Sequence, residues 1–166
     1  MGYYRAAFAR WLFLRLTDRA LERAPDFVIG DRQRPYMNRW HLVPRNRYFN
    51  IYLHEFLRSD DDRAEHDHPW LFNISFLLDG NYIEHTPKGQ EVFTRGAIKF
   101  RNATSPHRIE IAPGCAPCWT LFITGPKIRS WYFHCKHPDG SPKLVHHVKF
   151  TETNENGSII GKGCDA

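Results

Sequence analysis

The sequence predicts an all-β domain, an antiparallel sandwich or barrel, preceded by one helix. From residue 40 onward, short segments with strand character recur about every ten residues, with turn residues between them. The 166-residue chain also contains 11 glycines and 11 prolines, which favour many turns over a helix bundle. A chain of this length suits one domain with a hydrophobic core.

The N-terminal residues 3–23 are expected to form the helix. Arg15, Arg19 and Arg23 recur every four residues and form one polar stripe beside apolar faces. Such a helix suits the outside of a domain or a dimer contact, and with Trp11 it also allows a membrane-surface role. Arginines interrupt any signal peptide and no segment is long enough to span a membrane, so we expect a cytoplasmic protein.

The remaining elements follow in order along the chain. Residues 24–36 are expected to be a loop, the charged segment 58–67 another loop, and the polar segment 152–166 a flexible tail. Strands are expected at 47–57, 71–80, 81–86, 91–100, 107–112, 118–125, 130–135 and 143–151. The sequence therefore predicts three parts: a helix and loop over 1–30, a β-barrel over 31–151 and a tail over 152–166.

The charge and the cysteines bound the function. A net charge of +5 permits an anionic ligand, but the sequence has no Lys/Arg run, zinc-finger spacing or other specific nucleic-acid motif. Cys115 and Cys118 form a C-x-x-C pair, which can indicate zinc or redox chemistry. The segment after them reads as a turn entering a buried strand, so Cys118 is expected in the core. Cys164 is expected to be a free thiol in the tail.

The segment "HDHPW" raises the possibility of a metal site. Residues i and i+2 of a strand point to the same face, so His66 and His68 can chelate one cation through imidazole nitrogens. In a chain with 10 histidines, this spacing alone is weak evidence.

The surroundings of these histidines resemble the first motif of the cupin superfamily. That motif has Gly, five residues, His-x-His, three or four residues, Glu, six residues and Gly. In this chain Asp60 stands at the first Gly position, His66 and His68 match, Asn73 stands at the Glu position, and Gly80 matches.

The second cupin motif is matched in part as well. It has Gly, five residues, Pro-x-Gly, two residues, His, three residues and Asn. Gly96 and His107 match, whereas Asn102, Thr104 and Ile111 stand at the Pro, Gly and Asn positions. The resemblance covers roughly residues 47–135, and it also extends to small cupins of bacteria and phages.

The resemblance implies a jelly-roll (double-stranded β-helix) barrel and one divalent metal ion held by His66, His68 and His107. Three imidazoles without the usual Glu suit Fe(II) first, with Zn, Ni or Mn as alternatives. The implied function is a mononuclear non-haem iron dioxygenase acting on a small, anionic molecule. A metal-independent sugar or nucleotide isomerase and a non-enzymatic binding or structural cupin stay open. A homodimer is also compatible with this fold.

Further residues are candidates for roles around the metal. Proton transfer is assigned as a hypothesis to Tyr52, His54 or Glu55, with only one of the adjacent His54 and Glu55 facing the cavity. Substrate binding is assigned to Asn73, Arg101 and Arg108. Asp67 is expected at the surface, with an imidazole acceptor as the alternative. Solvated-loop or structural positions are expected for Asp60, Asp61, Asp62, Glu110, His41, His85, His134, His137, His146 and His147.

Overall fold

The computed structural model describes residues 2–60, 64–112, 114–154 and 157–166. The helices are α1 (Gly2–Ala20), α2 (His147–Phe150) and the 3-10 helix η1 (Gly163–Asp165). The strands are β1 (Phe27–Asp31), β2 (Arg34–His41), β3 (Asn50–Phe56), β4 (Glu65–His66), β5 (Phe72–Asp79), β6 (Asn81–Thr86), β7 (Gly89–Thr94), β8 (Ile98–Asn102), β9 (Arg108–Glu110), β10 (Cys118–Thr124), β11 (Tyr132–Lys136), β12 (Pro142–His146), β13 (Thr151–Asn154) and β14 (Gly157–Ile160).

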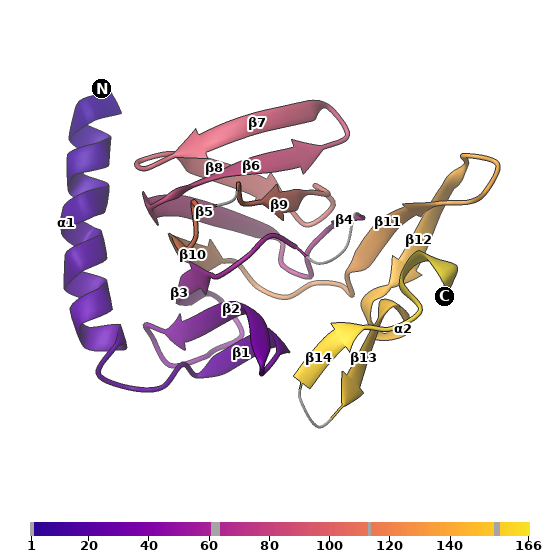
Figure 1. The fold of residues 1–166 in the computed structure, drawn as a ribbon, viewed down its shortest axis with the longest axis horizontal. Coiled ribbons are helices and arrows are strands. Elements are labelled where there is room, and N and C mark those ends of the chain that lie inside the picture. Colours follow the sequence, from indigo (N-terminus) through magenta and orange to yellow (C-terminus); the bar gives the residue numbers. More distant parts are fainter. Residues whose placement is uncertain (1, 61–63, 113, 155–156) are drawn as a thin grey trace.

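These strands form three antiparallel sheets. The large sheet has the order β13-β14-β1-β2-β3-β10-β5-β8, and the small sheets have the orders β7-β6-β9 and β12-β11-β4. In Figure 1, α1 stands at one side of the molecule, and the C-terminal strands β11 to β14 lie at the opposite side. The β-rich, antiparallel architecture with one N-terminal helix confirms the predicted fold class.

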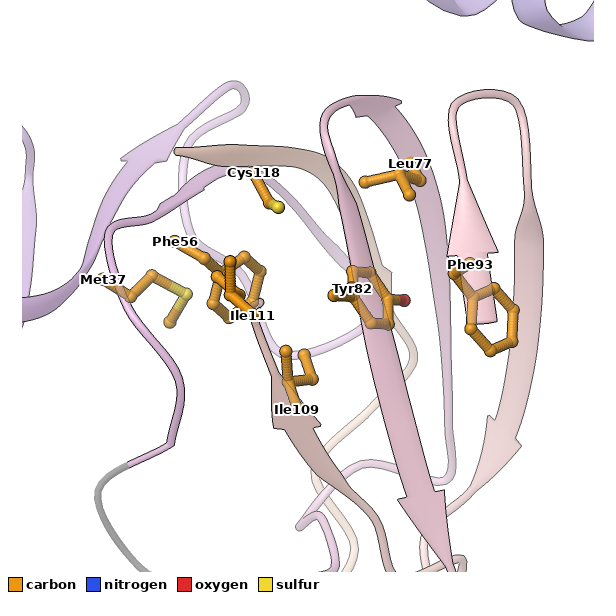
Figure 2. Close-up of a cluster of buried hydrophobic side chains, with 8 residues drawn as sticks. All are labelled: Met37, Phe56, Leu77, Tyr82, Phe93, Ile109, Ile111 and Cys118. Carbon is orange, nitrogen blue, oxygen red and sulfur yellow. The ribbon is translucent and has the colours of Figure 1, made fainter. Parts of the chain in front are cut away.

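The main core lies between the large sheet and the sheet of β6, β7 and β9 (Figure 2). It consists of side chains that alternate with outward-facing ones along each strand. The buried members are Met37, Phe56, Leu77, Tyr82, Phe93, Ile109, Ile111 and Cys118. The expectation that Cys118 belongs to the core is confirmed, and burial raises the pKa of its thiol to about 11.

Helix α1 packs on the opposite face of the large sheet. Leu53 and Leu78 alternate with the core residues of their strands, and they meet Leu12, Phe13 and Leu16 of the helix instead. The outer face of the helix leaves the aromatic residues Tyr3, Tyr4 and Trp11 exposed. Across the described residues, no helix is both long and apolar enough to cross a bilayer.

Several local predictions were wrong, among them the single strand at 143–151, because helix α2 separates β12 from β13. Residues 24–36 are not a loop, because most of them belong to β1, the turn after it and the start of β2. The register of this hairpin shifts at Gly30, whose φ is +96° and whose Cβ would lie 2.8 Å from the Tyr36 nitrogen, so the bulge favours glycine. The expected strand 91–100 is split into β7 and β8 around Gly96.

The C-terminal segment also differs from its prediction. Where a flexible tail was expected, β13 and β14 form a hairpin, and β14 pairs with β1. Cys164 is not free, because it forms a disulfide with Cys135 of β11. Disulfides are typical of oxidising compartments and rare in the cytosol. The disulfide therefore does not support the cytoplasmic location, which stays a prediction.

Candidate metal centre

Three imidazoles from two separate segments meet at one end of the barrel. His66 of β4 pairs with His107 through two main-chain hydrogen bonds, of 2.9 and 3.0 Å. The amide of His68 donates to the Ala103 carbonyl at 3.1 Å, which holds the second histidine beside the same segment. One ring nitrogen from each of the three histidines lies within 4.8 Å of the others. Main-chain pairing therefore brings together the predicted metal ligands.

The rings form a nearly equilateral triangle. Their centroids are 5.3 Å apart for His66 and His68, and 5.1 Å apart for each of the pairs that include His107. The Nε2 atoms of His68 and His107 are 2.9 Å apart. Two nitrogens that bind one ion at about 2.1 Å and at right angles would lie roughly 3.0 Å apart. The geometry therefore suits a shared ion, as well as a hydrogen bond between the two rings.

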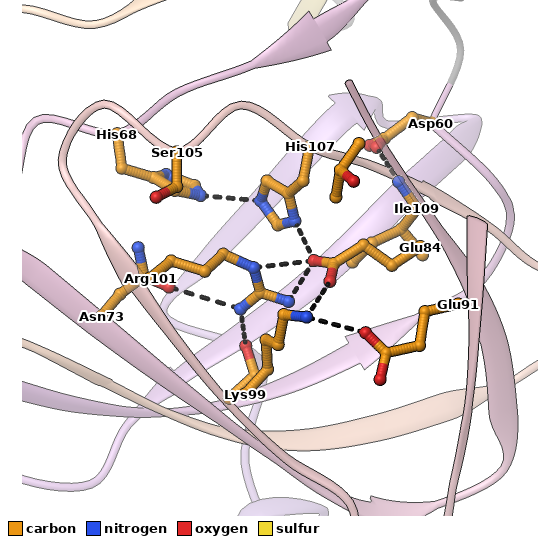
Figure 3. Close-up of polar contacts among 12 residues, drawn as sticks. Asp60, His68, Asn73, Glu84, Glu91, Lys99, Arg101, Ser105, His107 and Ile109 are labelled. Atoms are coloured by element: carbon orange, nitrogen blue, oxygen red, sulfur yellow. Dashed lines mark hydrogen bonds and ion pairs between the residues drawn. The ribbon is translucent and has the colours of Figure 1, made fainter. Parts of the chain in front are cut away.

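Glu84 of β6 fixes the orientation of the His107 ring. Its Oε1 atom lies 2.6 Å from Nδ1 of His107, so that nitrogen donates to the carboxylate and Nε2 is left facing His68 (Figure 3). Glu84 is completely buried and also forms an ion pair with Arg101. A carboxylate behind a ligand histidine sets its tautomer and raises its basicity, as in many metal sites.

Burial keeps the three imidazoles neutral. It lowers the pKa of His68 and of His107 well below the usual 6.5, and neighbouring positive groups add to this effect. Burial also lowers the pKa of His66. Neutral imidazoles are the form that binds metal ions. In addition, Nδ1 of His66 is buried without a hydrogen-bond partner among the described residues.

Two aspartates support the segment that carries the first two histidines. Asp60 accepts a hydrogen bond from the Ile109 amide at 2.7 Å and so ties the start of this segment to β9. Asp67 was expected at the surface, but it is 2% exposed. It accepts from the Tyr132 amide and pairs with Arg129, because these groups from the far side of the segment converge on it. Asp61 and Asp62 lie outside the described residues.

The histidines line a cavity of about 450 Å³, a volume typical of small-molecule sites. Aromatic side chains form part of its wall, among them Phe56, Trp70, Phe122, Trp131 and Phe133. Polar groups also line it, including Arg39, His54 and Thr120. His147, expected to be structural or at the surface, lines the cavity too and stacks on Trp131.

The three residues proposed for proton transfer are separated by the structure. His54 lines the cavity and is 2% exposed. Its strand neighbour Glu55 faces the other way and accepts from Asn38 at 2.9 Å. Tyr52 stacks on His54 but lines a neighbouring cavity instead. Strand alternation turns Glu55 away, and Tyr52 lies farther along the same face of the strand, so His54 is the one member of this set at the three-histidine cavity.

The three residues predicted to bind substrate do not line this cavity. Arg101 is 3% exposed, and its charge is already paired with Glu84. Asn73 is fully buried, with Oδ1 3.5 Å from that guanidinium. Arg108 donates to Glu110, which also contacts His85. These side chains are already engaged in protein contacts, and the prediction missed Arg39, which does line the cavity.

No protein-family model and no curated protein matches the sequence. Among solved structures, the chain is similar to a sugar phosphate isomerase of the cupin superfamily from Silicibacter pomeroyi. The TM-score is 0.52 and the identity 11%, over 75% of this chain and 87% of that one. The chain has a cupin fold.

Two other cupin neighbours are more distant in structure. A cupin superfamily protein from Desulfitobacterium hafniense has 14% identity and a TM-score of 0.46, over 55% of this chain and 78% of that one. Fe(II)-HppE has 18% identity and a TM-score of 0.45, over 54% of this chain and 49% of that one.

The chain departs from the usual cupin motif at the position of the carboxylate. Asn73 occupies the position where the motif has Glu, and it contacts Arg101 rather than the three histidines. The carboxylate that contacts one of the three histidines is instead Glu84, which binds Nδ1 of His107, the ring nitrogen that faces away from His68. Glu84 could not be predicted readily, because the segment "NYIEHT" is largely polar. In the structure its residues alternate, and Tyr82 and Glu84 point inward.

Proposed function

We propose that this cupin binds one divalent metal ion through His66, His68 and His107 and acts on a small molecule held in the adjoining cavity. The observation that carries the proposal is the convergence of three neutral imidazoles with a buried carboxylate, Glu84, behind one of them. Chance histidine pairs at a surface lack this support, which is a regular feature of metal-ligand histidines.

The donor set favours a mononuclear non-haem iron site of the three-histidine type. Three neutral ligands leave the full charge of the ion uncompensated, which favours an anionic substrate. Iron(II) is the first candidate by resemblance to cupin oxygenases that use three histidines, with zinc, nickel and manganese as alternatives. An ion bound there would polarise a coordinated substrate and, as iron(II), would activate oxygen. The proposed activity is therefore of the dioxygenase type.

Among the three residues considered for proton transfer, His54 is the one that lines the three-histidine cavity. Arg39 Nε donates to its Nε2 at 2.8 Å, so the neutral ring carries its proton on Nδ1. That Nδ1 atom is buried without a partner among the described residues. His54 therefore lines the cavity with a ring whose basic nitrogen is occupied by Arg39.

The first test is the metal content of protein purified without added metal or chelator. We expect about one equivalent of metal, lost in a His66→Ala/His107→Ala variant and retained in a His137→Ala/His146→Ala control. Iron would support oxygen-consumption assays with small anionic molecules. Zinc or nickel would retain the site and remove the dioxygenase assignment. No metal after anaerobic reconstitution with Fe(II) would contradict the proposal.

The second candidate is a metal-independent isomerase. The sugar phosphate isomerase from Silicibacter pomeroyi, with its TM-score of 0.52, favours it. An isomerase of this kind would convert a sugar phosphate at the same rate after a chelator has removed metal ions. It would also need a histidine that is free to act as a base. The bond from Arg39 to the basic nitrogen of His54 weighs against that residue as the base. A binding module would instead show stabilisation by a ligand without turnover.

A further inference from the structure

A second cavity adjoins the first on the other side of Arg39. Its volume is about 360 Å³, and it shares Arg39, Pro69 and Trp70 with the three-histidine cavity. Trp70 in turn stacks on His68, with ring centroids 5.4 Å apart. The second cavity therefore lies one side-chain layer away from the proposed metal ligands.

The lining of the second cavity is strongly cationic. Four of its residues are Arg39, Arg45, Arg47 and Lys127, and none of its lining residues is an Asp or a Glu. Asp26 holds the amide of His41, another lining residue, but its carboxylate is already paired with Arg23. A concave surface lined by one sign of charge concentrates ions of the opposite sign.

Arg39 is the member of this set with the strongest need for a counter-ion. Burial lowers the pKa of its guanidinium to about 10, and nearby Arg45 lowers it as well, but Arg39 stays cationic at neutral pH. Its Nε is used by His54, whereas no carboxylate in the described part of the chain pairs with its remaining nitrogens. A bound anion would supply the missing partner.

The other cations are carried by main-chain segments that are held in place. Lys127 lies opposite Trp70 in a main-chain bridge, and the Ile128 amide donates to the Pro69 carbonyl at 2.9 Å. Arg45 and Arg47 flank Asn46, whose main chain is held by Asn50 through bonds of 3.1 and 3.0 Å. The main chain that carries these cations is therefore held in place.

We propose that the second cavity binds the phosphate group of a phosphorylated small molecule whose other end enters the three-histidine cavity. Arginine matches phosphate through paired N–H donors, and four cations without a carboxylate suit a dianion better than a single carboxylate. Phosphate binding in this cavity does not depend on the proposed function, whereas its role in positioning a substrate rests on that function.

The test is calorimetric titration of inorganic phosphate into chelator-treated protein at low ionic strength. We expect Arg45→Gln/Arg47→Gln to weaken phosphate binding by roughly tenfold or more, because it removes two charge-assisted contacts. Arg15→Gln/Arg19→Gln on α1 removes the same charge elsewhere, and we expect binding close to that of the unaltered protein. The His66→Ala/His107→Ala variant should bind phosphate normally, which separates this site from the proposed metal centre.

Several results would overturn the assignment. Equal losses of phosphate affinity in the two arginine variants would show that phosphate is attracted only by the net charge of the protein. Binding that disappears in the histidine variant would place phosphate on the metal ligands. Acetate binding as tightly as phosphate would indicate a carboxylate site. Much tighter binding of a single-stranded oligonucleotide, lost in Arg45→Gln/Arg47→Gln, would indicate a nucleic-acid surface instead.

Discussion

Glu84 holds two buried groups at once: it accepts a hydrogen bond from the neutral ring of His107 and balances the charge of the Arg101 guanidinium. Because it is completely buried, water cannot replace it in either contact. The residue therefore links the stability of the barrel to the orientation of one proposed metal ligand.

We expect Glu84→Gln to weaken metal binding by about 10- to 100-fold, because the His107 ring loses its carboxylate acceptor. The variant should also lose about 3–5 kcal/mol of unfolding free energy, since Arg101 is left as an unpaired buried charge. The double variant Glu84→Gln/Arg101→Met removes that charge. It should regain stability but not metal affinity. Metal titration and urea unfolding distinguish the two effects, and unchanged metal affinity in the single variant would contradict this role.

The neutral buried histidines also set the pH dependence of the metal-free protein. Burial lowers the pKa of His54, His66, His68 and His107 in the folded state, whereas in the unfolded chain they titrate near 6.5. The unfolded state then binds more protons below pH 6.5, so stability falls as the pH drops below that value. Each histidine contributes up to about 1.4 kcal/mol per pH unit.

Urea unfolding of metal-free protein at pH 7.5, 6.5 and 5.5 measures this dependence. At pH 7.5 these histidines should contribute little slope, and their contribution should grow as the pH falls through 6.5. Between pH 6.5 and 5.5 the slope should be shallower in the His66→Ala/His107→Ala variant than in the unaltered protein. An equal slope in both proteins would show that other groups control acid sensitivity.

For individual residues, the sequence predicted the three histidines but not the carboxylate that orients one of them. His66, His68 and His107 are separated by motif spacings that a single chain displays directly. Glu84 reaches His107 only because β6 pairs with β9, and no spacing in the sequence encodes that register. The predicted surface position of Asp67 was wrong because long-range partners bury it, and pairing with Glu84 buries Arg101 in a similar way.

At the scale of elements, Gly96 sets the distance between α1 and the barrel. Its φ is +89°, and an added Cβ would lie 2.8 Å from the Ala6 nitrogen and 3.0 Å from the Arg5 carbonyl carbon. Both contacts are helix backbone, which cannot move aside without shifting the helix.

We expect Gly96→Ala to destabilise the protein by more than the backbone strain of about 1–3 kcal/mol that any positive-φ alanine incurs. Gly89→Ala is the matched control, because Gly89 has a φ of +124° and open space around it. Hydrogen exchange should be faster across α1 in the Gly96 variant alone. Equal stability of the two variants would show that the helix contact is not tight.

The elements predicted from sequence are those with their own periodic pattern. The segments of β3, β5 and β10 are long and apolar, and they pair with one another in the middle of the large sheet. The hairpins β1–β2 and β13–β14 were missed, because glycine, proline and polar residues dominate them locally. They become strands by pairing with one another at the edge of the sheet, through β1 and β14.

At the scale of the whole molecule, the disulfide holds the C-terminal segment against the cavity. Cys135 and Cys164 are 29 residues apart, and the enclosed chain includes His147, Thr151 and Ile159 of the cavity wall. A cross-link over this separation stabilises a protein by roughly 3–4 kcal/mol in the chain-entropy model.

We therefore expect Cys135→Ser/Cys164→Ser to lose about 3–4 kcal/mol of unfolding free energy and to become sensitive to proteolysis after residue 150. Cys115→Ser is the control, since that thiol is free. Unchanged stability of the double variant would show that packing alone holds the segment. The homodimer stays a prediction, and light scattering during size exclusion would measure it.

The cavity wall includes segments that the ribosome synthesises early and segments that it synthesises late. Asp31 of β1 pairs with Gly157 of β14, and Ile29 and Ile160 both line the cavity. The ribosome must add more than a hundred residues after β1 before this pairing can form, and contacts of such long sequence separation form slowly. The three histidines are synthesised well before the closing strand. We thus expect a growing chain to expose the three histidines before the closing strand is added, so that the proposed metal site would be accessible to an ion before the cavity closes.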